Sequence, residues 1–262
     1  MFRPRVIPVI LVDDRGHAVK SIRFRKPIDL GDSVNTVSLF NAFKVDELVV
    51  LDIMATRQRR HIRDDLMADI SSEARMPLAV GGGVTNCADI HRLLHAGAEK
   101  VILSNAAFTD PAFLREASSA FGSSSITVCI DVKKDWLGRY RVHMPAGGRH
   151  TAVTPEESAS AMEEQGAGEI IIQSVDKDGM MSGYDLALIS LVSDAVGVPV
   201  IALGGAGSFE HISEANRLTH ASAFASGSTF CFQDQNRGVL ISYPSAQELS
   251  TLARSSTSHT RT

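Results

Sequence analysis

The sequence is poor in several features that define protein classes. Aromatic residues make up only 6% of its 262 residues, and its three cysteines (Cys87, Cys129 and Cys231) lie far apart with no CxxC pair. This pattern excludes a disulfide framework or a cysteine zinc site and is typical of reduced thiols in a cytoplasmic protein. No apolar run reaches the roughly 18 residues that a membrane helix needs. The apolar run 6–12 lacks the cleavage site of a signal peptide, so no membrane partner is expected.

An excess of basic charge is also missing. The chain has 26 Lys and Arg against 30 Asp and Glu, a net charge of −4, so nucleic acid is not an expected partner. A hydrophobic content of 44% in a chain of this length suits a globular fold with a sizeable core. The last segment, 253–262, is polar without a core-facing pattern, and we expect it to be disordered.

Eight short β-rich runs alternate with amphipathic stretches along the chain. Continuous apolar runs of this kind suit strands that are buried on both faces of a parallel sheet. Eight successive β-then-α units predict a (β/α)8 TIM barrel, which we expect to form one domain over 1–252. The alternative is an open doubly wound sheet, which normally has fewer strands. The eight runs are 5–12, 47–53, 77–83, 100–105, 126–131, 169–174, 198–205 and 221–228.

Helix starts are marked in three places. Asp32 precedes an apolar stripe at Val34, Val37, Leu39, Phe40 and Phe43, with near-helical spacing. Thr154 and Ser245 each precede a glutamate by three positions, which predicts capping boxes.

The chain also carries an internal repeat. Gly81 and Gly204 lie 123 positions apart, and Glu47 and Glu169 lie 122 apart. In each half, 24 positions separate the glycine cluster from a small polar strand end, at Asn105 or at Ser228. The repeat predicts two half-barrels, about 1–122 and 123–252.

The repeated strand ends have the composition of phosphate sites. Glycine at a strand end lets backbone N–H groups approach an anion, and hydroxyl or amide side chains before a helix complete the site. Two such sites at one barrel mouth would fit a ligand with phosphate at both ends, or a diphosphate in a long molecule. The alternative is that the glycines only make tight turns.

Carboxylates at strand ends are the candidate acid–base groups, because barrel enzymes catalyse at that face. Asp52 and Asp131 end two of the runs, and Asp176 and Asp178 follow a third. Asp131 follows an apolar run, so burial should raise its pKa toward a useful range. The repeat places Leu11, which cannot carry a proton, at the position equivalent to Asp131.

Four charges begin strands at the opposite end of the predicted barrel. Arg5, Glu47, Lys100 and Glu169 each begin an apolar run, so a closed barrel would bring them together around its lumen. They predict either a polar gate for a small molecule or an ordinary solvated rim.

Two further features are weaker. The basic segment 15–26 after the first run is interpreted as a loop that is either a lid over an anionic substrate or a solvated face. His91 and His95 have helical spacing for a shared metal, but no third ligand accompanies them, so we expect neither a metal nor a cofactor.

Together these residues resemble the cyclase subunit of imidazole glycerol phosphate synthase. The resemblance runs from Arg5 to about Phe230 and is specific as a set. It rests on segments 46–53, 80–84, 97–101, 130–133, 166–170, 176–179, 183–185 and 204–207.

The resemblance implies a fold, a partner and residue roles. That family is a (β/α)8 barrel on whose N-terminal face a glutaminase subunit docks as a heterodimer, and ammonia passes through the barrel. The charged gate of the family matches Arg5, Glu47, Lys100 and Glu169, and one catalytic aspartate matches Asp131. The implied substrate- and phosphate-binding residues are Lys20, Asp52, Gly82, Gly83, Ser104, Asn105, Ser174, Asp178, Gly179, Gly204, Gly205, Gly227 and Ser228.

The sequence departs from the family at Leu11, where the other catalytic aspartate belongs, with Asp13 and Asp14 nearby as possible replacements. Segments 9–12, 19–24 and 230–244 look more like a paralogous branch found with surface-polysaccharide genes. The resemblance to that branch implies a third protein that uses the ammonia to amidate or amidinate a sugar.

Three hypotheses follow. The first is an ammonia-delivering subunit that serves such a sugar-modifying amidotransferase, with a phosphorylated molecule or nucleotide sugar as ligand. The second is an authentic histidine-pathway cyclase, and the third is a non-catalytic phosphate-binding activator of the glutaminase.

Overall fold

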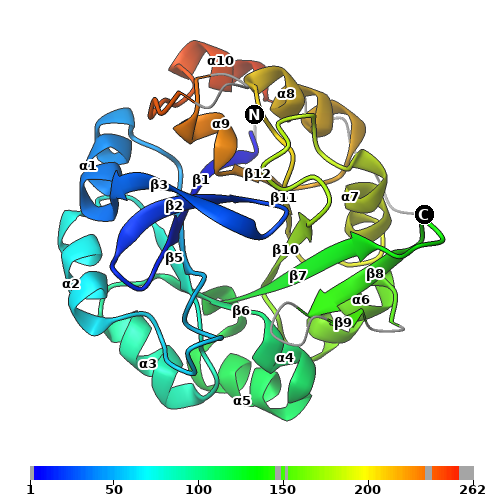
Figure 1. Ribbon diagram of the computed structural model, residues 1–262. Coiled ribbons are helices and arrows are strands. Elements are labelled where there is room, and N and C mark those ends of the chain that lie inside the picture. The colour runs from blue at the N-terminus through cyan, green and yellow to red at the C-terminus, as the bar shows by residue number, and fades with distance from the viewer. Residues whose placement is uncertain (1–2, 145–148, 151–152, 234–237, 254–262) are drawn as a thin grey trace.

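A computed structural model describes residues 3–144, 149–150, 153–233 and 238–253 of the chain. Eight parallel strands form a closed barrel, and the helices surround it (Figure 1). Because β7 pairs with both β6 and β10, and β1 with both β4 and β12, the ring has no open edge. The predicted (β/α)8 barrel is therefore confirmed, and the open doubly wound alternative was wrong. The barrel strands are β1 (Arg5–Val12), β4 (Leu48–Asp52), β5 (Leu78–Gly81), β6 (Lys100–Leu103), β7 (Ile126–Lys134), β10 (Glu169–Ser174), β11 (Val200–Leu203) and β12 (Ala223–Ser226).

Several helices begin at a residue whose side chain caps the helix. Asp32 accepts a hydrogen bond from the backbone N–H of Asn35 at the start of α1. The two predicted capping boxes are confirmed at Thr154 and Ser245, which begin α6 and α10. The helices are α1 (Ser33–Phe43), α2 (Asp64–Glu73), α3 (Cys87–His95), α4 (Asn105–Thr109), α5 (Pro111–Phe121), α6 (Pro155–Glu164), α7 (Leu186–Ser193), α8 (Phe209–Leu218), α9 (Ser228–Cys231) and α10 (Ala246–Thr251), with a 3₁₀ turn η1 (Ser123–Ser125).

Two antiparallel hairpins extend the barrel sheet at the carboxyl ends of the strands. β2 (His17–Ile22) and β3 (Arg25–Asp32) follow β1, while β8 (Tyr140–Met144) and β9 (Arg149–His150) follow β7. The interpretation of 15–26 as a loop was therefore wrong. Its turn is Arg23-Phe24, with φ values of 50° and 59°, where such turns normally carry Asn or Gly. Without those residues, the sequence gives no hairpin signal.

The internal repeat is visible in the strand registers. Leu11 pairs in register with Leu51 on β4, and Asp131 pairs with Gln173 on β10. Each half also starts with a long strand that continues into a hairpin. Leu11 and Asp131 thus hold equivalent positions in the two halves, as the sequence spacing predicts.

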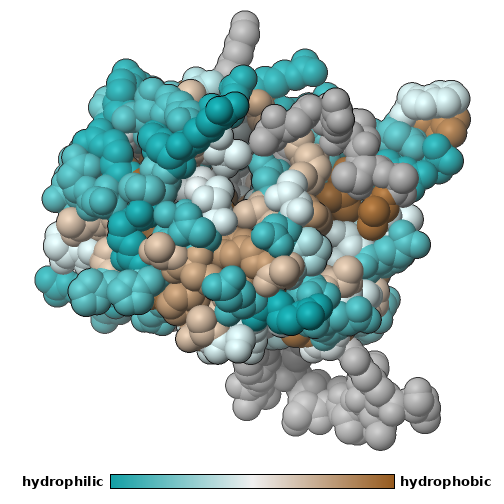
Figure 2. Space-filling view, turned by 90° about the horizontal axis from the view of Figure 1, so that it is seen from below, coloured by the Kyte–Doolittle hydropathy of each residue, from teal (hydrophilic) through white to brown (hydrophobic). Residues whose placement is uncertain are grey.

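The core has two parts. One lies between the barrel and the helices, and the other fills the barrel lumen with small and branched side chains. The outer face of the helical layer is mostly polar, as Figure 2 shows for one side of the molecule. The stripe predicted on α1 is only partly buried, since Val37 and Phe40 are in the core while Leu39 and Phe43 are exposed. Within the described ranges, no helix combines the length and apolarity that crossing a membrane requires.

The segment expected to be disordered, 253–262, lies outside the described residues except for Ala253.

Candidate active site

A cavity of about 1160 Å³ opens at the carboxyl ends of the barrel strands. It reaches from the hairpin tip down into the lumen, where Val9, Ile102, Cys129 and Leu203 form its floor. The cavity brings together nearly all of the predicted site residues. They are Leu11, Lys20, Asp52, Gly82, Gly83, Ser104, Asn105, Asp131, Asp178, Gly179, Gly204, Gly205, Gly227 and Ser228.

Asp131 is one of several buried carboxyl groups that line this cavity. Burial raises its pKa to about 7, with a further contribution from the charge of Asp178, while a hydrogen bond from the Cys129 thiol, 3.9 Å away, acts in the opposite direction. A carboxyl group that titrates near neutral pH can both donate and accept a proton under working conditions. The expected elevation of this pKa therefore agrees with its surroundings.

Asp178 is paired with Lys20. The Lys20 Nζ lies 2.7 Å from Asp178 Oδ1, and both side chains are buried. The aliphatic stem of Lys20 passes Gly227, where an added Cβ would lie 3.2 Å from Lys20 Cδ. Glycine at 227 thus leaves room for the lysine to reach across the cavity.

The first hairpin lies over the barrel mouth, where Figure 1 shows β2 and β3 crossing the opening. The backbone N–H of Arg23 donates to the carbonyl of Asp178 at 3.0 Å, and Ser21 Oγ lies 3.3 Å from the Asp178 carboxylate. These contacts join the hairpin to the turn after β10 and hold Lys20 inward. The arrangement supports the lid interpretation of this basic segment over that of a solvated face.

Two buried polar atoms in the cavity lack a protein partner among the described residues. They are Asn105 Oδ1 at the start of α4 and Ser228 Oγ at the start of α9. These residues hold equivalent places in the two half-barrels. An unpaired buried polar atom costs about 1–3 kcal/mol, so a site that keeps two of them is built for a polar ligand or for ordered water.

The glycines beside these atoms have a packing explanation of their own. Gly83 has φ of +70°, and an added Cβ would lie 1.8 Å from the Arg60 carbonyl oxygen. Gly205 has φ of +109°, and its Cβ would lie 2.2 Å from the carbonyl oxygen of Gly183. The turns therefore require glycine whether or not a phosphate binds. The unpaired Ser228 hydroxyl, which can donate a hydrogen bond, is the stronger argument for an anion site, whereas the Asn105 Oδ1 atom needs a donor such as a ligand hydroxyl or water.

Asp52 organises the loop that follows β4. Its carboxylate accepts the backbone N–H groups of Met54 and Ala55 at 2.9 Å and pairs with Arg60 at 2.5 Å. Because these partners engage both carboxylate oxygens, Asp52 serves mainly to position the loop that follows β4. It orients Arg60 at the cavity wall.

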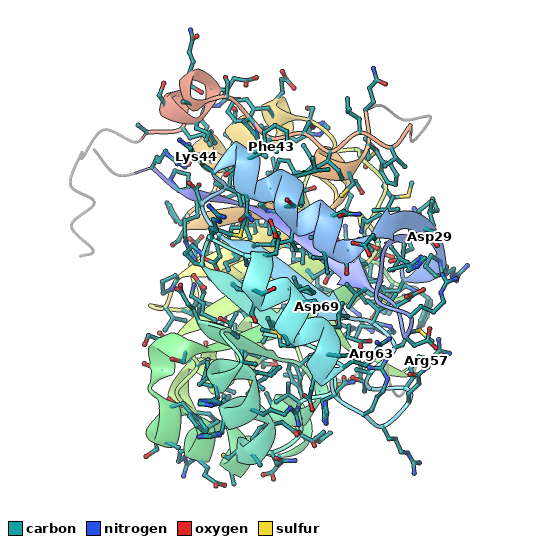
Figure 3. All side chains as sticks on the ribbon, turned by 90° about the vertical axis from the view of Figure 1, so that its left-hand side faces the viewer. Asp29, Phe43, Lys44, Arg57, Arg63 and Asp69 are labelled. Atoms are coloured by element: carbon teal, nitrogen blue, oxygen red, sulfur yellow. The ribbon has the colours of Figure 1, made fainter. Side chains whose placement is uncertain are left out.

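This loop also carries a basic wall that our sequence analysis missed. Arg57, Arg59 and Arg60 line the cavity. Figure 3 shows Arg57 at the mouth end of the barrel, with Phe43 and Lys44 at the other end. The run of three arginines within four residues after a strand end was the available signal. Together with Lys20, they make the cavity suitable for an anionic ligand.

Three predicted or alternative residues lie outside the cavity wall. Ser174 is buried, and its carbonyl accepts the N–H groups of Lys177 and Asp178. Asp13 accepts the N–H of His17 and pairs with Arg15, and the exposed Asp14 accepts from Gln58. Neither aspartate lines the cavity that contains Leu11 and Asp131.

The four charges at the opposite end form a closed ring. Arg5 pairs with both Glu47 and Glu169, and Lys100 Nζ lies 3.2 Å from Glu47 and 2.8 Å from Glu169. We call Arg5, Glu47, Lys100 and Glu169 the gate ring. The glutamates are nearly buried while the two cations remain partly exposed, so the ring closes the lumen on its amino-terminal side.

The electrostatics of the gate ring are balanced. Burial alone would lower the pKa of Arg5, but the carboxylates of Glu169 and Glu47 outweigh it and raise that pKa above its ordinary value. Two cations and two anions in alternation leave no net charge in the ring.

His91 and His95, the weak metal candidate, stack on α3 with ring centroids 6.0 Å apart. Among the described residues, no group of three or more ligating side chains accompanies them.

The comparison with known proteins decides the family. The model of the family described as "Histidine biosynthesis protein" matches residues 5–236. The chain belongs to this family.

Similar proteins within the family cover almost the whole chain. A Pseudomonas aeruginosa protein provisionally named imidazole glycerol phosphate synthase subunit hisF2 is 40% identical over 249 residues, 95% of this chain and 99% of its own length. The imidazole glycerol phosphate synthase subunit HisF of a Hydrogenobaculum species is 40% identical over 243 residues, covering 93% and 96%. A Vibrio vulnificus protein provisionally named subunit hisF3 is 38% identical over 249 residues, covering 95% of each chain. The chain is therefore similar both to numbered paralogues and to a subunit that carries the plain name.

Proposed function

We propose that this protein receives ammonia from a glutaminase partner and delivers it through the barrel for amidation or amidination of a sugar in surface-polysaccharide synthesis. The glutaminase would dock on the amino-terminal face, over the gate ring. A third, sugar-modifying amidotransferase would take the ammonia at the mouth. The cytoplasm is the proposed location, supported by the three free thiols.

One observation carries the proposal. The gate ring is complete, with all four ion pairs formed, while Leu11 faces the cavity where a second acid–base group would stand. A barrel that only binds a ligand has no use for a neutral polar gate. A barrel that must protonate and deprotonate a substrate from both sides needs more than one carboxyl group at this position.

The remaining cavity chemistry supports an anionic ligand. Lys20 and Arg60 supply fixed positive charge, and Asn105 and Ser228 offer unpaired polar atoms on opposite halves. A phosphorylated sugar or a nucleotide sugar has the charge and hydrogen-bonding groups to use all four. The relatives named as numbered paralogues are consistent with a role apart from the histidine pathway.

The test combines the purified chain with the glutaminase and the sugar-modifying amidotransferase of the same genome. Product is formed either from glutamine or from added ammonium chloride. Lys100→Ala opens the gate ring, so glutamine-driven product should fall at least tenfold while ammonium-driven product is unchanged. Arg115→Ala, which removes an exposed positive charge from the outer surface of α5, is the control and should affect neither. An equal fall in both reactions would show that the ring is not a gate.

A second candidate function is the histidine-pathway cyclase itself. It is favoured by Asp131, whose pKa of about 7 suits acid–base chemistry, and by the similarity to the Hydrogenobaculum subunit. The discriminating assay supplies the purified chain with the ribulosyl precursor of that pathway and excess ammonium, and follows imidazole glycerol phosphate. Turnover at an ordinary enzymatic rate would support this candidate. Absence of turnover from folded protein would favour ammonia delivery or the third hypothesis, a non-catalytic activator, which predicts faster glutamine hydrolysis on ligand binding without ammonia transfer.

A further inference from the structure

Apart from Arg5, Glu47 and Lys100 of the gate ring, the described lumen of the barrel is polar along only two neighbouring strands. On β7 the lumen positions are Thr127, Cys129 and Asp131, and on β10 they include Glu169 and Gln173. We call these five residues the polar seam. The other members of the described lumen cluster are apolar, namely Ile7, Val9, Leu11, Val49, Leu51, Ala79, Ile102, Ile171, Ile201, Leu203, Ala223 and Ala225.

Thr127 is the unexplained member of the polar seam. It is 1% exposed, and its hydroxyl oxygen has no hydrogen-bond partner among the described residues. Alternation along the strand directs it inward, because Cys129 belongs to the lumen cluster while Val128 packs in the outer core. Its register partner on β10 is Glu169 of the gate ring. The hydroxyl therefore faces the lumen beside the gate.

A buried hydroxyl without a hydrogen-bond partner lowers the stability of the folded protein. A buried hydroxyl without a partner costs about 1–3 kcal/mol, and valine has the same shape without that cost. The other neighbour of Thr127 in register, Ile102, already lines the cavity, so the cavity floor lies close above the hydroxyl. Ala79, Ala223 and Ala225 contribute the smallest side chains of the wall.

We propose that the Thr127 hydroxyl is a binding station for one ammonia molecule between the gate ring and Asp131. Neutral ammonia offers three N–H donors and one lone pair, so it can accept a hydrogen bond from the Thr127 hydroxyl while donating one toward the Glu169 carboxylate. The Cys129 thiol is the next hydrogen-bonding group along β7, and Asp131 stands at the cavity end. This inference rests on the proposed function and adds to it a route along one wall of the lumen.

A direct test uses methyl-labelled protein in NMR spectroscopy and does not require the partners. At pH 9 a useful fraction of ammonium chloride is neutral ammonia, which can enter from the mouth. We expect the Thr127 methyl resonance to move saturably with ammonium chloride but not with potassium chloride. The methyl of Thr36, a buried threonine on α1 outside the lumen, is the internal control. An unchanged Thr127 resonance would mean that water or nothing occupies the position, and would overturn the proposal.

The functional test uses two substitutions that separate the hydroxyl from side-chain shape. Thr127→Val removes the hydroxyl and Thr127→Ser keeps it, and Thr36→Val makes the same chemical change outside the lumen. Reactions contain ¹⁵N-amide glutamine and unlabelled ammonium, and the product is analysed for its nitrogen source. We expect Thr127→Val to lower the glutamine-derived fraction several-fold, while Thr127→Ser and Thr36→Val preserve it.

The outcomes separate the two proposals. If Lys100→Ala lowers the glutamine-derived fraction but Thr127→Val does not, ammonia passes the barrel without the station, and only this inference fails. If the unmodified chain already takes its product nitrogen from solution, ammonia delivery fails as well.

Discussion

Leu11 faces Asp131 across the mouth of the barrel. The two residues hold equivalent positions in the half-barrels, and in the closed ring of strands β1 and β7 lie on opposite sides. Both line the cavity. Asp131 can therefore exchange a proton near neutral pH, whereas Leu11 at the equivalent position on the opposite side cannot.

Leu11→Asp tests whether the absence of a second carboxyl group opposite Asp131 limits cyclase activity. A second carboxyl group opposite Asp131 should raise any weak cyclase activity with ammonium by 10²-fold or more, since one acid–base group typically contributes 10²–10⁴-fold. Leu51→Asp, which places the same carboxyl group on the neighbouring strand, is the matched control and should give no gain. If Leu11→Asp also gives none, the substrate pocket itself has diverged from that of a cyclase.

Asp131 should make stability depend on pH. Its pKa is near 3.8 when unfolded and about 7 when folded, so the folded state binds the extra proton between these values. The stabilisation is complete below about pH 4 and is lost as pH rises through 7. For a shift of this size the loss amounts to roughly 4 kcal/mol.

Asp131→Asn removes that dependence. Denaturant unfolding at pH 5 and pH 8 should show a much smaller change in the free energy of unfolding for Asp131→Asn than for the unmodified chain. The exposed Asp64 provides the control variant Asp64→Asn, which should keep the original dependence. Equal pH profiles for Asp131→Asn and the unmodified chain would place the titrating group elsewhere.

Ser228 and Ser226 form a natural pair for testing the phosphate site. The Ser228 hydroxyl is buried without a described partner, while the Ser226 hydroxyl lies 2.9 Å from the Thr229 hydroxyl. Ser228→Ala should therefore raise the free energy of unfolding of the ligand-free protein by about 1 kcal/mol, whereas Ser226→Ala should lower it by a similar amount.

Bound phosphate should favour the unmodified chain over Ser228→Ala, because that variant lacks the hydroxyl that would donate to the anion. Inorganic phosphate at several times its Kd should stabilise the unmodified chain against heat, and Ser228→Ala should lose much of that gain. Thermal unfolding with and without phosphate measures both effects. A Ser228→Ala variant that is destabilised without ligand and keeps its full phosphate response would show that the hydroxyl is not part of an anion site.

The barrel could be predicted because its signals are local and repeated. Each buried strand is a short apolar run, and the offset between Gly81 and Gly204 repeats in the other elements. The gate ring could be anticipated because charges that begin buried strands converge in a closed barrel. Only the structure shows that Glu47 and Glu169 each pair with both Arg5 and Lys100.

Other features depended on contacts that the sequence does not display. Asp52 was predicted to bind substrate, but its oxygens are already engaged by Arg60 and two backbone N–H groups. Thr127 passed unnoticed because threonine is common in strands, and only its lack of a partner distinguishes it. Leu39 and Phe43 fit a helical stripe but lie beyond the reach of the core.

The tip of the first hairpin is strained, which gives a last prediction. Phe24 has φ of 59° in a conformation that costs a residue with a side chain about 1–2 kcal/mol, and its side chain is 38% exposed. Asparagine tolerates this region better. Phe24→Asn should therefore raise the free energy of unfolding by up to about 1 kcal/mol.

The same substitution tests whether the hairpin opens as a lid. The amide of Arg23 donates to Asp178, so its hydrogen exchange reports separation of the hairpin from the turn after β10. If opening relieves the strain at Phe24, Phe24→Asn should slow exchange at this amide by up to about fivefold. Lys44→Asn relieves a similar φ of 54° at the far end of α1 and should stabilise the protein without changing that exchange. Equal slowing by both variants would mean that the amide exchanges through global unfolding, and that the hairpin does not open separately.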